Sequence, residues 1–202
     1  GRKLNDNDLT ILDKWIISKM HILINDATNA YDAFRVDKFM RSFDRFLDDL
    51  SNWYIRRNRR RFWKAEDDMD KLTAYQTLYE VLFTTIRLLA PCLPFVTEEI
   101  YQNLVRSSIS DAPESIHLCD FPEADETCIA EKLMVQVDAL RKVVEQSRSA
   151  RNKANLKIRQ PLAKLCFVVD DDGVAAFIEE NSKVILDELN VKDLERIANV
   201  SE

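Results

Sequence analysis

The chain has 202 residues, of which 46% are hydrophobic and 32% charged, with a net charge of -6, a composition typical of a soluble globular protein that can bury a core. No apolar run approaches the roughly 20 residues needed to cross a bilayer, and no charged-then-apolar leader opens the chain. Only two glycines occur, Gly1 and Gly173, which excludes glycine-rich phosphate loops and the elbow that carries a nucleophilic serine.

Hydrophobic residues at helical spacing predict two long helices in the first third of the chain. The first follows the polar triplet 6–8, whose side chains can cap a helix N-terminus. The second covers about residues 36–64 and is much longer than the average helix. The stripes expected to face the core are Leu9, Leu12, Ile16, Met20, Leu23 and Ala27 in the first helix, and Val36, Phe39, Phe43, Leu47, Leu50 and Tyr54 in the second.

Two more helices are expected before residue 106. The third is stopped by Pro91 and Pro94, because proline cannot continue a helix, and the fourth covers about residues 95–105. The acidic residues 66–68 suit the start of the third helix, where carboxylates complement the helix dipole. The apolar stripe of the third helix is Leu72, Tyr75, Leu78, Leu82, Ile86 and Leu89.

The pattern changes after residue 106. Residues 107–125 are rich in Ser, Asp and Pro and predict a loop, with a short extended stretch at 115–122. The fold class is mainly α: an antiparallel helical bundle at 1–124, followed by a small α/β appendage at 125–202. The appendage is expected to hold a fifth helix at about 127–152 with Leu133, Val137, Leu140 and Val144 facing inward, a strand at 165–169, a turn at 170–173, two short helices near 174–181 and 184–189, and a tail at 191–198 that fits a strand or a helix.

The cysteines and histidines do not form a metal-binding pattern. The chain has no C-x-x-C pair, and its two histidines lie far apart, so we expect no zinc site and no metal. Thiols scattered in this way are typical of a reducing cytosol, which predicts a cytoplasmic location. With two histidines and no phosphate loop, the chain is expected to perform no chemistry by itself. The residues concerned are Cys92, Cys119, Cys128, Cys166, His21 and His117.

Residues 51–64 are the most distinctive stretch, with six cations, four large aromatic residues and no carboxylate. Such a cluster in an acidic chain suits a negatively charged partner with flat faces, as single-stranded RNA or DNA has. Five of the cations are arginines, whose planar guanidinium group fits phosphates and base edges. The alternative is a solvated, charged helix end with buried tryptophans.

At 100° per residue, the apolar stripe of the second helix passes Tyr54 and continues onto Asn58, Arg57 and Arg61. This predicts a helix end that projects beyond the bundle. Ile55 and Phe62 fall on the opposite side, where they are exposed unless another surface covers them. A third, mixed face holds Trp53, Arg56, Arg60, Trp63 and Lys64.

A second basic window lies at residues 148–164, across the end of the fifth helix and the loop after it. It has no carboxylate. RNA contact and a simple complement to the dipole of the helix C-terminus are both open interpretations. Its cations are Arg148, Arg151, Lys153, Lys157, Arg159 and Lys164.

Residues 50–63, Leu-Ser-Asn-Trp-Tyr-Ile-Arg-Arg-Asn-Arg-Arg-Arg-Phe-Trp, closely resemble the signature helix in the anticodon-binding domain of isoleucyl-tRNA synthetases, which are class I aminoacyl-tRNA synthetases. The Ala-Pro-Cys-Leu-Pro-Phe turn within residues 89–98 is shared with valyl and leucyl relatives. The Arg-Gln-Pro-Leu element at 159–162 points more narrowly to the isoleucyl enzyme. Further matches lie in order at 12–16 and 115–117, so the resemblance covers nearly the whole chain.

The family ligates isoleucine to its tRNA in a catalytic domain that uses ATP and Mg²⁺, and it edits valine errors in an inserted domain. The signatures of those domains do not occur in this sequence. The resemblance therefore implies a fragment that binds and positions tRNA, without catalytic residues or a cofactor of its own. It implies as partners the anticodon stem-loop of isoleucine tRNA and the catalytic domain of the same enzyme, with no membrane partner.

By resemblance to the methionyl relative, the aromatic residue that closes the signature helix stacks on an anticodon base. Core packing is an equal alternative for Trp53 and Tyr54. The residues expected to bind RNA are Trp63, Arg56, Arg57, Arg60, Arg61, Lys64 and Trp53, with a secondary set of Arg148, Arg151, Lys157 and Arg159.

Two alternative functions stay open besides the isoleucyl one. The chain could be the same module of a valyl- or leucyl-tRNA synthetase, which competition between specific tRNAs would separate. It could instead be a helical scaffold whose basic helix docks only on its own catalytic domain, which predicts no salt-sensitive RNA binding. A free-standing enzyme is the weakest option, since no phosphate loop, triad or metal cluster is visible.

Overall fold

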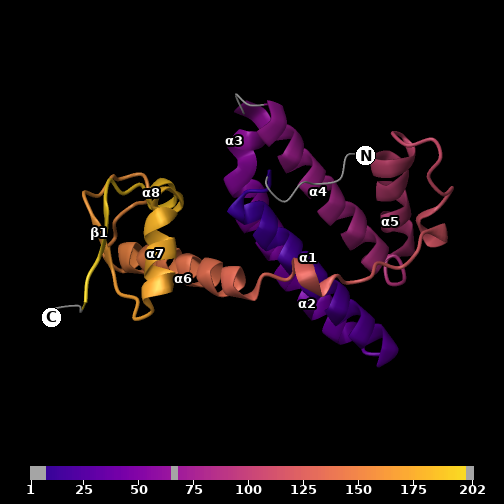
Figure 1. The fold of residues 1–202 in the computed structure, drawn as a ribbon, viewed down its shortest axis with the longest axis horizontal. Coiled ribbons are helices and arrows are strands. Elements are labelled where there is room, and N and C mark those ends of the chain that lie inside the picture. The colour runs from indigo at the N-terminus through magenta and orange to yellow at the C-terminus, as the bar shows by residue number, and fades with distance from the viewer. Residues whose placement is uncertain (1–7, 65–67, 199–202) are drawn as a thin grey trace. The chain divides into compact units, whose positions relative to one another are not determined.

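The computed structural model describes residues 8–64 and 68–198, shown in Figure 1. By their contacts these residues form two compact units, the first ending at Ala130 and the second beginning at Glu131. The fold class expected from the sequence is confirmed, because the first unit is helical and the second combines helices with a two-stranded sheet. The expected boundary at 124/125 stays a prediction. None of the described helices is long and apolar enough to cross a membrane.

The first helix, α1 (Ile11–Asp32), contacts both α2 (Val36–Asp48) and α4 (Asp68–Leu89). It begins with a capping box at Thr10, whose hydroxyl accepts from the Asp13 amide while the Thr10 amide donates to the Asp13 carboxylate. The cap expected at 6–8 is therefore wrong, and residues 6 and 7 lie outside the described part. Four residues of the stripe expected for α1 are buried, as predicted: Ile16, Met20, Leu23 and Ala27.

One helical segment runs from Val36 to Lys64, as predicted, but it has three parts: α2, a π-helical segment η1 (Asp49–Ile55) and α3 (Arg56–Lys64). Hydrogen bonds from residue i to i+5 widen each turn beyond the 3.6 residues of an α-helix. Each residue of η1 therefore turns the chain by less than 100°. As a result, the side chains of α3 point in other directions than they would in an unbroken α-helix.

The expected stripe of the segment is corrected at positions in α2 as well as at positions in and after the π segment. Val36 and Leu47 were expected in the core but are exposed, whereas Phe46 and Trp53 are buried. Phe62 was expected to be exposed, yet it is buried and its ring lies 5.3 Å from the ring of Tyr75 in α4. The π segment turns Phe62 into the bundle.

The third predicted helix corresponds to α4 and ends before Pro91, as expected. Of the buried face predicted for it, Ile86 and Leu89 are buried and Leu78 and Leu82 half-buried, but Leu72 and Tyr75 are exposed. The hydroxyl of Thr85 donates to the Val81 carbonyl at 2.6 Å, which satisfies a buried polar group inside its own helix. The buried residues of α4 are Thr73, Ala74, Thr77, Val81, Thr84, Thr85, Ile86, Leu88 and Leu89.

The rest of the first unit holds the fourth predicted helix and two short turns, one packed on that helix and one on α1. The fourth predicted helix consists of α5 (Pro94–Tyr101) and a π-helical segment η2 (Gln102–Arg106). The stretch at 115–122 was expected to be extended, but it contains a 3₁₀ turn, η3 (Ile116–Leu118). The turn forms because the Ser115 hydroxyl accepts from the His117 amide and Glu98 accepts from the Ile116 amide. A second 3₁₀ turn is η4 (Glu126–Cys128).

The second unit contains the helices and the first strand expected from the sequence, but the turn expected at 170–173 is cut short because α7 begins at Asp172. Its elements are α6 (Glu131–Lys153), β1 (Leu165–Phe167), α7 (Asp172–Glu180), α8 (Ser182–Leu189) and β2 (Leu194–Arg196). The ambiguous tail forms β2, which pairs in parallel with β1. Val137, Leu140 and Val144 are buried as expected, and Leu133 is half-buried.

Candidate nucleic-acid interface

The basic helix α3 lies against the start of α4 in the first unit (Figure 1). Its two sides differ sharply in burial. Asn58 and Phe62 are buried and Arg61 is nearly so, whereas Arg59 and Arg60 are exposed. The expectation that this helix end projects free of the bundle is therefore wrong on one side, because α1 and α4 cover it.

The covered side of α3 holds a network of charged groups. The guanidinium of Arg61 lies 3.0 Å from the Asp13 carboxylate and 2.7 Å from the Asp70 carboxylate, and it donates to the amide oxygen of Asn58 at 3.2 Å. The hydroxyl of Tyr54 donates to Asp13 at 2.6 Å. Each of these residues is buried or partly buried and has a charged partner, as a stable buried network requires, although the buried Nδ2 of Asn58 makes no hydrogen bond within the described residues.

The network also fixes the charge of its members. Burial raises the pKa of the Asp13 carboxyl, but bonds from Arg61, Thr10 and Tyr54 outweigh this and leave it below its usual value. Burial lowers the pKa of Arg61, but its bonds to Asp13 and then Asp70 raise it above the usual value. Asp13 and Arg61 are therefore both charged at neutral pH.

The outer side of α3 carries a stacked pair. The guanidinium of Arg59 lies 4.7 Å from the centre of the Trp63 ring, and 67% of Trp63 is exposed. A similar pair, Arg57 over Trp53 at 4.9 Å, differs because Trp53 is only 7% exposed. Trp63 thus offers a ring to a partner and Trp53 does not.

Arg59 was missing from the residues expected to bind RNA. A usable signal was present, since Arg59 and Trp63 are four residues apart and so share a helix face. Arg56 is exposed and Arg57 is half-buried. The side chain of Lys64, which ends α3, lies outside the described residues.

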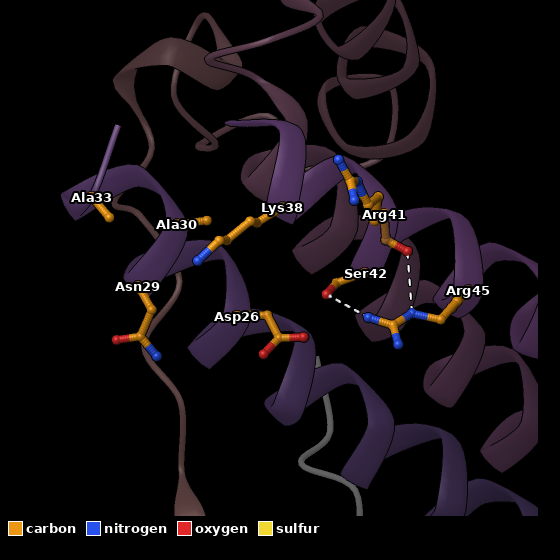
Figure 2. A pocket seen from close by; sticks show the side chains of 8 residues that line it. All are labelled: Asp26, Asn29, Ala30, Ala33, Lys38, Arg41, Ser42 and Arg45. Carbon is orange, nitrogen blue, oxygen red and sulfur yellow. Dashed lines mark hydrogen bonds between the residues drawn. The ribbon is translucent and has the colours of Figure 1, made fainter. Parts of the chain in front are cut away.

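Figure 2 shows a pocket between α1 and α2, with Lys38, Arg41 and Arg45 from α2 and Asp26 from α1 among its lining residues. Arg45 donates to the Arg41 carbonyl and to the Ser42 hydroxyl, both at 3.3 Å. The lining mixes both signs of charge and includes no aromatic residue. It therefore differs from the surface of α3, where cations surround an exposed ring.

Some cations of the second basic window are bonded to other protein groups, and others are exposed on a loop. Arg148 pairs with Glu188, and Arg151 is 5% exposed with its guanidinium bonded to backbone carbonyls. Lys157 and Arg159 are exposed on the loop after α6. Among the described residues, no group of three or more His, Cys, Asp or Glu side chains is arranged to hold a metal ion.

The sequence profile of the anticodon-binding domain of tRNA ligase matches residues 13–166 of this chain. The chain belongs to this family. The match begins at Asp13, the partner of Arg61, and ends in β1, so it includes the whole of α3. The resemblance inferred from residues 50–63 is confirmed.

Individual tRNA ligases show the same relationship. The isoleucine–tRNA ligase of Dehalococcoides mccartyi is 46% identical over 194 residues, which are 96% of this chain and 19% of its own length. That of Clostridium tetani is 45% identical over 184 residues, 91% of this chain and 17% of its own length. That of Thermococcus kodakarensis is 40% identical over 195 residues, which are 95% of this chain and 18% of its own length. This anticodon-binding domain thus spans less than a fifth of the length of these curated relatives.

Proposed function

We propose that this chain is the tRNA-binding part of an isoleucine–tRNA ligase and that it positions the anticodon stem-loop of isoleucine tRNA. The observation that carries the proposal is the exposed Trp63 ring, stacked under Arg59 and flanked by further cations on a helix of an anticodon-binding domain. Aromatic rings that stack on bases, beside cations that follow the backbone, are how single-stranded nucleic acid is bound.

The two sides of α3 would then have different tasks. Trp63 stacks on an unpaired base, and Arg56, Arg57, Arg59, Arg60 and Lys64 contact phosphates or base edges. Arg61 is a positioning residue, because its guanidinium is already held by Asp13 and Asp70. Trp53 likewise supports the helix from the buried side.

In the whole enzyme, ligation of isoleucine to tRNA requires ATP and Mg²⁺, and we assign no residue of this chain to either. We propose that the chain contributes to that reaction by binding, so that the acceptor end of the tRNA reaches a catalytic domain elsewhere in the same enzyme. Its partners would be the tRNA and that domain, and its location the cytoplasm.

A competition experiment tests the proposal. A fluorescently labelled stem-loop with the isoleucine anticodon is bound to the chain and displaced by unlabelled isoleucine, valine or leucine stem-loops. We expect the isoleucine competitor to displace the probe at the lowest concentration. Preferential displacement by a valine or leucine stem-loop would assign the module to that enzyme. Absence of salt-sensitive binding would favour a scaffold that docks on the catalytic domain.

A further inference from the structure

The loop after α6 exposes four consecutive side chains, Lys157, Ile158, Arg159 and Gln160. Exposed loops usually leave their carbonyl groups to water. In this loop all four carbonyl oxygens instead accept hydrogen bonds from protein side chains. The loop 157–160 therefore turns its backbone carbonyls to the protein and its side chains to solvent.

Two residues make all of these bonds. Arg151 donates to the first carbonyl of the loop at 3.0 Å and to the last at 3.0 and 3.1 Å. The side-chain amide of Asn190 donates to the two middle carbonyls, at 3.3 and 2.9 Å. Such a clamp fixes the loop at each residue rather than only at its ends.

Both clamping residues are held from elsewhere in the second unit. Arg151 is 5% exposed and also donates to the Leu189 carbonyl at the end of α8, at 2.7 Å. Asn190 caps α8 in the left-handed conformation, with φ of 51°, which asparagine and glycine adopt more readily than other residues. Its carbonyl accepts from the Leu162 amide at 3.1 Å, just after the loop.

The cations of the clamped loop differ from their neighbours in the basic window. Arg148 pairs with Glu188 and Lys164 with Glu195. Within the described part of the chain, neither Lys157 nor Arg159 has an ion-pair partner. Two such cations on a loop of fixed shape suit a row of phosphates, because little conformational freedom is lost on binding.

We infer that the loop 157–160 is a second RNA-binding element, which takes the sugar–phosphate backbone of tRNA, and that Arg151 and Asn190 are positioning residues that hold it in its binding shape. This inference rests on the proposed function. On this inference the buried Arg151 does not contact the RNA. Its guanidinium affects RNA binding only by holding the loop.

The test uses Asn190→Gly in the whole chain, because glycine keeps the left-handed backbone while removing the amide donor. Asn181→Gly is the matched control, since it removes a similar amide-to-carbonyl bond, to Phe177 at 2.8 Å, away from the loop. We expect only Asn190→Gly to speed trypsin cleavage after Lys157 and Arg159. It should also weaken binding of an isoleucine tRNA transcript by about threefold to tenfold, because the loop must then be ordered when the RNA binds.

A double-mutant cycle separates positioning from general damage. The variant Lys157→Ala/Arg159→Ala should bind the transcript less tightly, with a salt slope smaller by about two. Adding Asn190→Gly to that variant should change affinity no further. An equal loss from Asn190→Gly in both backgrounds, or unchanged trypsin cleavage, would overturn the positioning role.

The same variants can disprove the role of the loop without disproving the proposed function. If Lys157→Ala/Arg159→Ala binds the transcript with wild-type affinity and salt slope while Trp63→Ala binds it weakly, the loop is not an RNA-binding element. If neither variant differs from the wild type, the proposed function fails together with the loop.

Discussion

The guanidinium of Arg61 lies 3.0 Å from the carboxylate of Asp13, so an arginine of α3 is bound to the first turn of α1. The same guanidinium reaches Asp70 at the start of α4, at 2.7 Å. One side chain therefore joins three helices. These bonds fix the orientation of α3. Its opposite side, which carries Arg59, Arg60 and Trp63, is therefore held toward solvent.

The first prediction concerns this ion pair. Asp13→Asn should lower the free energy of unfolding by about 3 kcal/mol at pH 7, because it leaves a partly buried guanidinium short of one charge partner. The folded pKa of Asp13 lies below its usual value, so the stabilisation is present above the unfolded pKa of about 3.9 and is lost as the pH falls through the folded value. The difference between variant and wild type should therefore shrink below about pH 4.

Urea unfolding at pH 7, 5 and 3.5 measures this difference. Asp44→Asn serves as the control, since Asp44 is an exposed carboxylate of α2, and it should change stability by less than about 0.5 kcal/mol. A deficit for Asp13→Asn that is the same at all three pH values would contradict the account.

The second prediction concerns the exposed ring. Trp15 is 0%, Trp53 7% and Trp63 67% exposed, so acrylamide should quench mainly the fluorescence of Trp63. Adding the isoleucine stem-loop should protect that ring. Trp63→Ala should weaken binding by about 1–3 kcal/mol, the usual contribution of a stacked base. The matched control is Phe95→Ala, which removes another exposed ring, 90% accessible, from the first unit.

Binding of the stem-loop by fluorescence anisotropy gives these affinities. The variant Trp63→Phe should bind nearly as well as the wild type, because a phenyl ring still stacks. Equal losses for Trp63→Ala and Phe95→Ala would show that the effect does not depend on this position.

The third prediction tests the π-helical segment. Phe62→Ala should lower the unfolding free energy by about 3 kcal/mol, because it empties a buried site against Tyr75. Leu47→Ala should cost less than about 1 kcal/mol, since Leu47 is 43% exposed. An unbroken α-helix from 36 to 64 would turn Phe62 away from Tyr75, and Phe62→Ala would then cost as little as Leu47→Ala. Thermal unfolding of the two variants decides between these geometries.

The extents of the helices could be predicted from the sequence, but their inward faces could not always be. Val36 to Lys64 is helical as expected, because apolar residues recur along it at helical spacing and no proline interrupts it. The burial of Phe62 was missed because a π segment has no clear sequence signal and changes the rotation by which the faces after it are assigned. In α4, Thr77 and Thr85 are buried. A prediction from hydrophobic residues alone cannot find them, because threonine is not counted as hydrophobic.

The candidate site shows the same limit. The composition of residues 51–64 pointed to a nucleic-acid surface, but composition does not say which cations are taken by carboxylates of other helices. Arg61 is held by Asp13, which is distant in sequence, and such a pairing becomes visible only in the fold. The stack of Arg59 on Trp63 is local, and its spacing of four residues made it predictable.

The central claim is that the outer side of α3 binds the phosphates of isoleucine tRNA. The most direct test is stem-loop affinity across a salt series for the wild type, Arg60→Ala and Arg41→Ala. Arg41 is the matched control because it is 77% exposed on α2 and pairs with Asp37. The account predicts that Arg60→Ala reduces the salt slope by about one while Arg41→Ala leaves it unchanged. Binding that does not depend on salt, or identical slopes for Arg60→Ala and the wild type, would contradict it.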